Sequence, residues 1–170
     1  DPGAAFGTGT HATTSLCLEV LENYITEDSI VLDIGCGSGI LSIAAVLLGA
    51  KSAVGVDIDA QSVKVAKENA EINNVSDKID YIVGDLADKV SGKYNIVCAN
   101  IVADVIIKLL ENVADFMEDD AVLITSGIID LREQDVVSAF ARFGFSVMER
   151  HIKDNWCAFV LTKPFKPVRI

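Results

Sequence analysis

Hydrophobic and polar positions divide the chain into two kinds of segment. Short apolar runs rich in Ile and Val recur along it, and polar residues or glycines bound most of them. Runs of this length and composition predict strands that are buried within a sheet. The predicted strands are Ser29–Ile34, Ser52–Asp57, Ile79–Val83, Tyr94–Ala99, Ala121–Ser126, Phe145–His151 and Trp156–Thr162.

Longer segments between these runs space their apolar residues three and four positions apart, which predicts helices with one buried face. Asp59 is expected to cap the second of these helices, and Asp130 with Glu133 is expected to form a capping box. The four predicted faces comprise Leu16, Val20 and Tyr24; Val63, Ala66 and Ala70; Val105, Leu109, Val113 and Phe116; and Val136, Phe140 and Phe143.

Strands that alternate with helices predict an α/β fold, in which helices cover both faces of a mostly parallel sheet. The last two strands differ, because only the turn around Lys153–Asn155 joins them. A connection this short allows only an antiparallel hairpin. We therefore expect about seven strands, the last of which runs backwards.

Composition narrows the class of protein. A chain of 170 residues, 51% hydrophobic and 23% charged, fits one globular domain. Its four scattered cysteines include no C-x-x-C pair, so we expect reduced, buried thiols and no structural metal.

The longest apolar run, Ile40–Ala50, is too short to cross a bilayer, and no segment resembles a signal peptide. These features favour a cytoplasmic protein without membrane attachment.

The net charge of −11 bears on possible partners. Binding of bare nucleic acid depends on Lys and Arg that neutralise phosphates, so an acidic surface disfavours it. The same surface attracts a basic partner.

The strongest local motif is "VLDIGCGSGILSIAA", an apolar run that leads through Gly35, Gly37 and Gly39 into a helix. In open α/β sheets, ligands bind at the carboxyl ends of the strands, where glycines let them approach the backbone. The spacing G-x-G-x-G differs from the dinucleotide motif, because Ile40 stands where that motif has its third glycine. A strand-to-helix turn without a ligand is the alternative interpretation.

Asp57 follows Gly35 by 22 residues and ends the next predicted strand. A carboxylate at this place can accept hydrogen bonds from both hydroxyls of a ribose. Capping of the following helix is the alternative role, but Asp59 is better placed for that.

Two further polar residues follow later strands. Asp85 comes after the third strand and could accept from an adenine amino group, unless it is an ordinary turn residue. Asn100 comes after the fourth strand and could hold an amino group in place, unless it caps a helix. Together with Gly35 and Asp57, these residues indicate a nucleoside pocket.

This set of residues resembles the Rossmann-like S-adenosylmethionine-dependent methyltransferases. The segments "DPGAAFGTGTHATT", "LDIGCGSGILSIAA", "GVDIDAQSV", "ANIVADV", "SGI" and the ending W-x-A-F-V-x-T-K are similar to the catalytic domain of the bacterial ribosomal protein methyltransferases of the PrmA type. The similarity covers nearly all of residues 1–163. It implies S-adenosyl-L-methionine as cofactor, with contacts from Thr14, Gly35, Asp57 and Asn100.

The resemblance also implies a domain organisation. Residues 1–163 would form the methyltransferase domain, 1–11 a loop that covers the cofactor, and 164–170 a tail. Phe6 in that loop would exclude water, and we expect Asp1–Thr10 to be ordered when cofactor is bound and mobile without it. His11 is expected to be a loop or capping residue rather than a base. Family members carry a substrate-recognition domain upstream, which this sequence does not contain.

The function that the resemblance implies is methylation of lysine or N-terminal amines on a ribosomal protein at the stalk base, with Asn100 orienting the amine. An RNA or small-molecule methyltransferase on the same fold is an alternative, although Asn100-Ile-Val-Ala lacks the Asn-Pro-Pro-aromatic sequence common where base nitrogens are methylated. A third hypothesis is a nucleoside-binding module without catalysis or a nicotinamide-dependent oxidoreductase. The spacing at Ile40 argues against the oxidoreductase.

Overall fold

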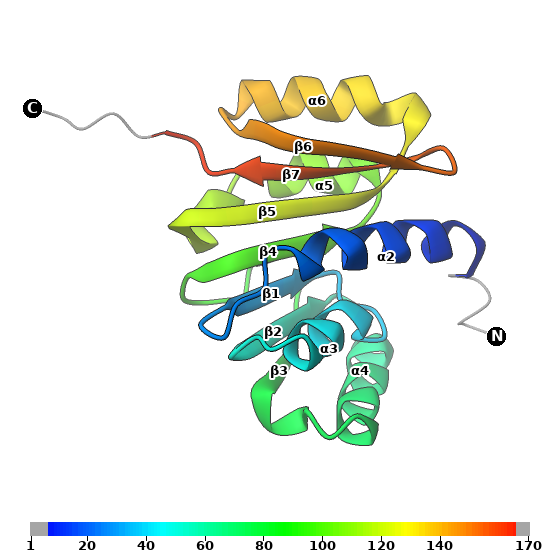
Figure 1. Cartoon of the computed structure of the whole chain (residues 1–170), viewed down its shortest axis with the longest axis vertical. Coiled ribbons are helices and arrows are strands. Elements are labelled where there is room, and N and C mark those ends of the chain that lie inside the picture. Colours follow the sequence, from blue (N-terminus) through cyan, green and yellow to red (C-terminus); the bar gives the residue numbers. More distant parts are fainter. Residues whose placement is uncertain (1–6, 166–170) are drawn as a thin grey trace, which may run out of the picture.

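A seven-stranded sheet with the order β3-β2-β1-β4-β5-β7-β6 forms the centre of the protein (Figure 1). The computed structural model describes residues 7–165, and the side chains of residues 12–165. Strands β1 to β5 pair in parallel, whereas β7 pairs antiparallel with both β5 and β6. The strands are β1 Ile30–Ile34, β2 Ser52–Asp57, β3 Ile79–Val83, β4 Tyr94–Asn100, β5 Met117–Ile129, β6 Ser146–Lys153 and β7 Trp156–Thr162. The predicted α/β sheet with a reversed last strand is confirmed.

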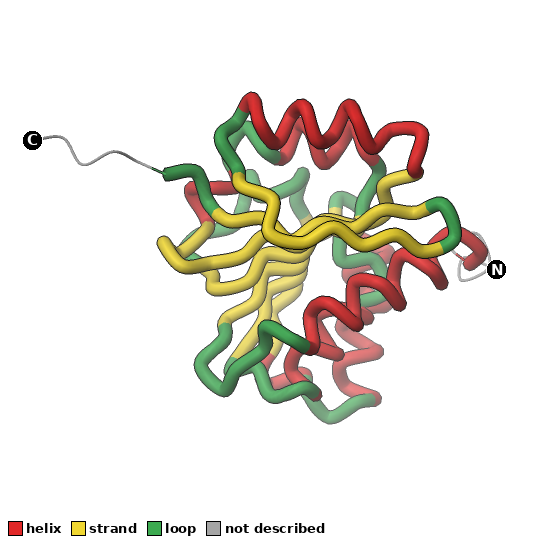
Figure 2. The backbone as a smooth tube through the Cα atoms, turned by 45° about the horizontal axis from the view of Figure 1, so that its top comes forward, coloured by secondary structure: helices red, strands yellow, loops and turns green. Residues whose placement is uncertain are grey.

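Helices cover both faces of the sheet, which explains why the central strands are apolar on both sides (Figures 1 and 2). One core lies beneath α2, α3 and α4 and includes Leu21, Leu41 and Val63. The other lies beneath α5 and α6 and includes Ile106 and Phe140. The helices are α2 Gly7–Glu22, α3 Ile40–Leu47, α4 Ala60–Ile72, α5 Ala103–Leu109 and α6 Glu133–Arg142.

Helix α2 packs against β5 and β7, and hydrogen bonds join it and the segment that follows it to the β6–β7 hairpin. Lys153 Nζ donates to Ser15 Oγ at 2.8 Å, and the Tyr24 hydroxyl donates to Glu149. Asp154 and Asn155 form the hairpin turn with φ values of 49° and 67°. Two residues with positive φ match the tight turn that the twist of antiparallel strands favours, and Asn and Asp tolerate that conformation.

Two predictions about helix ends are wrong. The helix predicted to run to Phe116 ends at Leu109, and a separate 3₁₀ turn follows at Val113–Phe116. No capping box forms at Asp130, because a 3₁₀ turn at Asp130–Arg132 precedes α6, and Glu133 pairs with Arg150 at 2.7 Å. The Asp59 cap is confirmed: its Oδ1 accepts from the Gln61 amide at 2.9 Å.

The predicted loop over residues 1–11 is wrong for part of its length, because residues 7–11 form the first turns of α2. Residues 1–6, which include Phe6, lie outside the described residues, as do 166–170 of the predicted tail. The side chain of His11 lies outside them as well.

All four cysteines are buried free thiols, as predicted: Cys17, Cys36, Cys98 and Cys157. Among the described residues, no helix combines the length and the apolar character that a membrane crossing requires.

Candidate active site

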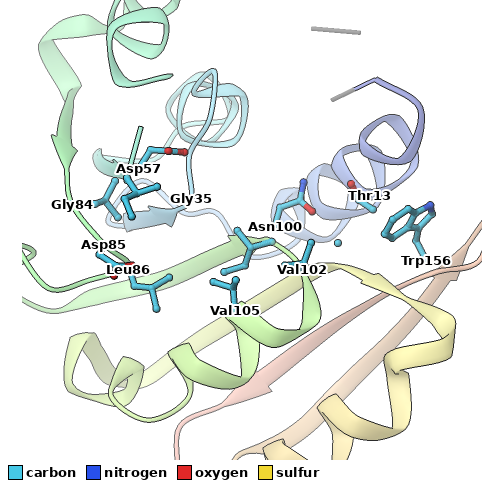
Figure 3. A pocket seen from close by; sticks show the side chains of 14 residues that line it. Thr13, Gly35, Asp57, Gly84, Asp85, Leu86, Asn100, Val102, Val105 and Trp156 are labelled. Carbon is cyan, nitrogen blue, oxygen red and sulfur yellow. The ribbon is translucent and has the colours of Figure 1, made fainter. Parts of the chain in front are cut away.

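A cavity of about 610 Å³ opens at the carboxyl ends of the parallel strands (Figure 3). Its volume falls within the range typical of pockets for small organic ligands. The residues that line it come from the ends of β1 to β5, from α2 and α5 and from the start of β7. They are Thr13, Gly35, Val56, Asp57, Ile58, Gly84, Asp85, Leu86, Asn100, Ile101, Val102, Val105, Gly127 and Trp156.

The Asp57 carboxylate is fixed at one end of the cavity by two backbone amides. Gly37 N–H donates to Asp57 Oδ2 at 2.9 Å, and Asp59 N–H donates to Oδ1 at 2.9 Å. Each carboxylate oxygen keeps a free lone pair, because an oxygen of this kind accepts about two hydrogen bonds. Asp57 can therefore still accept from the two hydroxyls of a ribose.

Close packing against Ile101 requires a glycine at position 35. Its φ is +70°, and a Cβ placed on it would lie 2.5 Å from Ile101 Cγ2. The turn after β1 and the segment after β4 therefore approach each other more closely than any side chain at position 35 allows. Both Gly35 and Ile101 line the cavity.

Asp33 lies beneath the glycine turn and is 1% exposed. Its Oδ2 accepts from the Ser42 amide at 3.2 Å, which satisfies a donor in the first turn of α3, since the N-cap Gly39 has no side chain to do so. Oδ1 has no hydrogen-bond partner in the described part of the chain. Burial, with a smaller contribution from the Asp57 charge, raises the pKa of Asp33 to about 7.

Tyr81 supports the same turn from the neighbouring strand β3. Ser42 Oγ donates to the Gly39 carbonyl at 2.9 Å, so the Tyr81 hydroxyl, 2.8 Å away, is the donor to Ser42. Burial raises the pKa of Tyr81 to about 12, which keeps this donor protonated. Side chains from β1, α3 and β3 thus fix the glycine turn from below.

Asn100 is the last residue of β4 and lies at the other end of the cavity (Figure 3). Its Nδ2 donates to Thr14 Oγ1 at 3.4 Å, and nearby Ser126 Oγ donates to the Thr13 carbonyl at 3.1 Å. Trp156 lies beside Thr13 in the same close-up and forms part of the wall. Helix α2 therefore brings a polar segment to the carboxyl edge of the sheet.

The cavity also has an apolar wall. Ile58 and Val102 are 70% and 63% exposed, although they are aliphatic and stand one and two residues after the ends of buried strands. With Leu86 and Val105 they line the cavity, and Figure 3 shows Leu86 on the side of Asp57 and Val102 beside Asn100. A flat aromatic base would cover such surface, and Asp85 stands at its border.

Four of the residues proposed from sequence meet in the cavity: Gly35, Asp57, Asp85 and Asn100. Gly37 and Thr14 do not line it, and each instead hydrogen-bonds to a residue that does. Sequence reasoning missed Asp33, Tyr81 and the apolar wall. The sequence contained a signal for two of these features. Asp33 is a charged residue inside an apolar run, and the wall residues Ile58 and Leu86 each follow a candidate acid directly.

A parallel sheet with a reversed β7, a glycine turn after β1 and an acidic residue ending β2 is the arrangement of the class I S-adenosylmethionine-dependent methyltransferase fold. More closely, the chain belongs to the ribosomal protein L11 methyltransferase (PrmA) family, whose family model matches residues 1–164.

Two curated relatives illustrate the similarity. A ribosomal protein L11 methyltransferase from Thermoanaerobacter pseudethanolicus is 45% identical over 163 residues, covering 96% of this chain and 52% of the relative. One from Clostridium botulinum Eklund 17B is 48% identical over 160 residues, covering 94% of this chain and 51% of the relative. The chain thus spans about half the length of these relatives.

Solved structures show the same fold. A ribosomal protein L11 methylase from Lactobacillus delbrueckii subsp. bulgaricus superposes with a TM-score of 0.86 at 31% identity, covering 90% of this chain and 79% of that one. An RNA methyltransferase from Salinibacter ruber, solved with S-adenosyl-L-homocysteine, has a TM-score of 0.71 at 21% identity, with coverages of 92% and 93%. At 21% identity, the similarity to this RNA methyltransferase shows a shared fold only.

Proposed function

We propose that the chain is the catalytic part of an S-adenosyl-L-methionine-dependent protein N-methyltransferase, which modifies lysine or N-terminal amines of a basic ribosomal protein. The observation that carries this proposal is the cavity itself, with the Asp57 carboxylate at one end and the Asn100 amide at the other. Family membership and the names of the relatives support it.

The donor groups fit the parts of this cofactor. Asp57 suits the ribose, the wall around Ile58 and Leu86 suits the adenine ring, and Asp85 suits its amino group. The turn at Gly35, where no Cβ fits, would let the methionine end approach the backbone closely. When bound, S-adenosyl-L-methionine supplies a methyl group on a sulfonium, which a neutral amine can take by in-line displacement.

The residues of the chain have to orient an uncharged amine. Asn100 Nδ2 is engaged with Thr14, so the carbonyl oxygen Oδ1 is the atom that can accept from a substrate N–H. A lysine amine has a solution pKa near 10.4, and burial in a closed site lowers it. Thr13 and Trp156 line this end of the cavity. We assign no general base.

The acidic charge of the chain suits a basic substrate. At −11, the chain attracts a protein rich in Lys and Arg and repels bare nucleic acid. The relatives are about twice as long as this chain, which leaves room in them for a separate domain that recognises the substrate.

The decisive experiment combines binding with methyl transfer. Calorimetry should show that S-adenosyl-L-methionine binds more tightly than NAD, and the reverse order would rule out a methyltransferase. The chain should then be incubated with methyl-labelled cofactor and either a basic ribosomal protein or RNA. Label on protein amines, located by mass spectrometry, is the expected result. Label on RNA alone would favour an RNA methyltransferase.

A further inference from the structure

Strand β5 loses its regular pairing near its carboxyl end. The register with β7 shifts between Thr125 and Ile128, and the residues in between are Ser126 and Gly127. Gly127 has a φ of +80°, a conformation that side-chain-bearing residues rarely adopt. An irregularity of this kind is a β-bulge, which changes the direction of nearby groups and often lies beside an active site.

Ser126 ties the bulge to two neighbouring segments. It is fully buried, and its hydroxyl donates to the Thr13 carbonyl of α2 at 3.1 Å. Its own carbonyl accepts from the Ile101 amide, which follows β4, at 3.2 Å. The bulge thus connects α2 with the backbone that carries Asn100.

Gly127 packs directly against Asn100. A Cβ on Gly127 would lie 2.9 Å from Asn100 Oδ1, 2.9 Å from the Ile101 carbonyl oxygen and 3.1 Å from the Ile101 nitrogen. The two Ile101 atoms belong to the backbone, which cannot move aside as a flexible side chain can. A methyl group at position 127 would therefore displace the Asn100 carboxamide or the turn that holds it.

We propose that the Ser126–Gly127 bulge is a positioning element, which sets the Asn100 carboxamide in the orientation needed for methyl transfer. Gly127 acts as a positioning residue because it leaves the space that Asn100 Oδ1 occupies. The inference rests on the proposed function in one respect, namely that Asn100 serves methyl transfer. The dependence of the Asn100 orientation on Gly127 is separate from that reaction.

The chain offers a matched control for backbone strain. Gly92 has a φ of +88°, close to that of Gly127, yet a Cβ on it would meet no heavy atom of the described residues within 4 Å. Gly92→Ala therefore introduces the same left-handed strain without a clash. Any effect of Gly127→Ala beyond that of Gly92→Ala comes from the contact with Asn100 and Ile101.

The test compares wild type, Gly127→Ala and Gly92→Ala by three measurements. Gly127→Ala should lower the methyl-transfer rate at saturating cofactor by about tenfold to a hundredfold, because small displacements of positioned groups cost that much. Cofactor affinity should fall by a clearly smaller factor than the rate, since Asp57 lies at the other end of the cavity from Asn100. The side-chain amide NMR signal of Asn100 should shift in Gly127→Ala and stay in place in Gly92→Ala.

The proposal is overturned if the two glycine variants behave alike, or if Gly127→Ala leaves both the Asn100 signal and the rate unchanged. Should Gly127→Ala not fold, Ser126→Ala tests the same element, because it removes only the hydroxyl that reaches Thr13. A lowered rate with intact cofactor affinity supports the proposal, and a wild-type rate contradicts it. If wild type transfers no methyl group, the proposed function fails, while the Asn100 signal still decides the positioning role.

Discussion

Asp57 and Asp59 stand two residues apart and have different environments. Asp57 accepts from the amides of Gly37 and Asp59 and faces the cavity. Asp59 accepts from the Gln61 amide and from the Ser62 hydroxyl at the start of α4. The pair therefore separates ligand binding from helix capping within a single short segment.

Replacing each of the two acids should have a different consequence. Asp57→Ala should weaken binding of S-adenosyl-L-methionine at least about tenfold, because hydrogen bonds to a charged group contribute roughly 1.5–3 kcal/mol each. Asp59→Ala should lower the free energy of unfolding by about 1 kcal/mol and leave cofactor affinity unchanged. Calorimetry and urea unfolding measure the two effects. Unchanged affinity in Asp57→Ala would show that this carboxylate serves only the local fold.

Asp33 should make stability depend on pH in an unusual direction. The native carboxyl keeps its proton up to a pKa of about 7, whereas the ordinary pKa of an Asp side chain is 3.8. Between these values the native state binds more protons than the unfolded state, so stability falls as pH rises. Relative to Asp33→Asn, the wild type should lose about 1.4 kcal/mol per pH unit in this window. Urea unfolding of both proteins at about pH 5 and about pH 7 tests this, and a constant difference would contradict it.

At the scale of elements, one row of residues connects three strands with the glycine turn. Asp33 on β1, Gly55 on β2 and Tyr81 on β3 are partners in the parallel register. Because Gly55 has no side chain, the Tyr81 ring lies over it and its hydroxyl reaches Ser42. Because Gly55 on β2 has no side chain, Tyr81 on β3 can reach across it and support the glycine turn that follows β1.

A methyl group at position 55 should disturb this arrangement. Its carbon would lie 2.6 Å from two ring atoms of Tyr81, so Gly55→Ala should cost about 1–3 kcal/mol of stability through overpacking. In a Tyr81→Ala background the ring is gone, and the same methyl should cost less. Equal costs in the two backgrounds, measured by urea unfolding, would show that the contact with Tyr81 is not responsible.

For the whole molecule, the net charge of −11 should govern association with the proposed basic substrate. Opposite charges speed encounter, and salt screens them, since the Debye length is about 10 Å at 0.1 M and shorter at higher salt. Raising salt from about 0.05 to about 0.3 M should therefore slow association with a basic protein substantially and hardly change cofactor binding. Stopped-flow association rates and calorimetry separate the two. Salt-independent association would argue against an electrostatically guided partner.

Much of the architecture could be predicted from local patterns. Buried strands between covering helices produce unbroken apolar runs, and the Asp154–Asn155 turn is too short for anything except a hairpin. The ends of elements were less predictable. Glu133 pairs with Arg150 on β6 instead of completing a capping box, and residues 7–11 join α2 despite their glycines. For Glu133, the ion pair with Arg150, which is 17 residues away in the sequence, replaces the capping box that the local pattern predicts.

The sequence by itself determined the carboxyl-edge site, because Gly35, Asp57, Asp85 and Asn100 each follow a strand, and parallel strands end at one edge. It did not determine what lies beneath and beside them. The support of Tyr81 for the glycine turn, the burial of Asp33 beneath it and the contact of Gly127 with Asn100 arise between residues far apart in the chain. Such contacts depend on register, burial and close packing, which no local pattern encodes, so only the tertiary structure decided them.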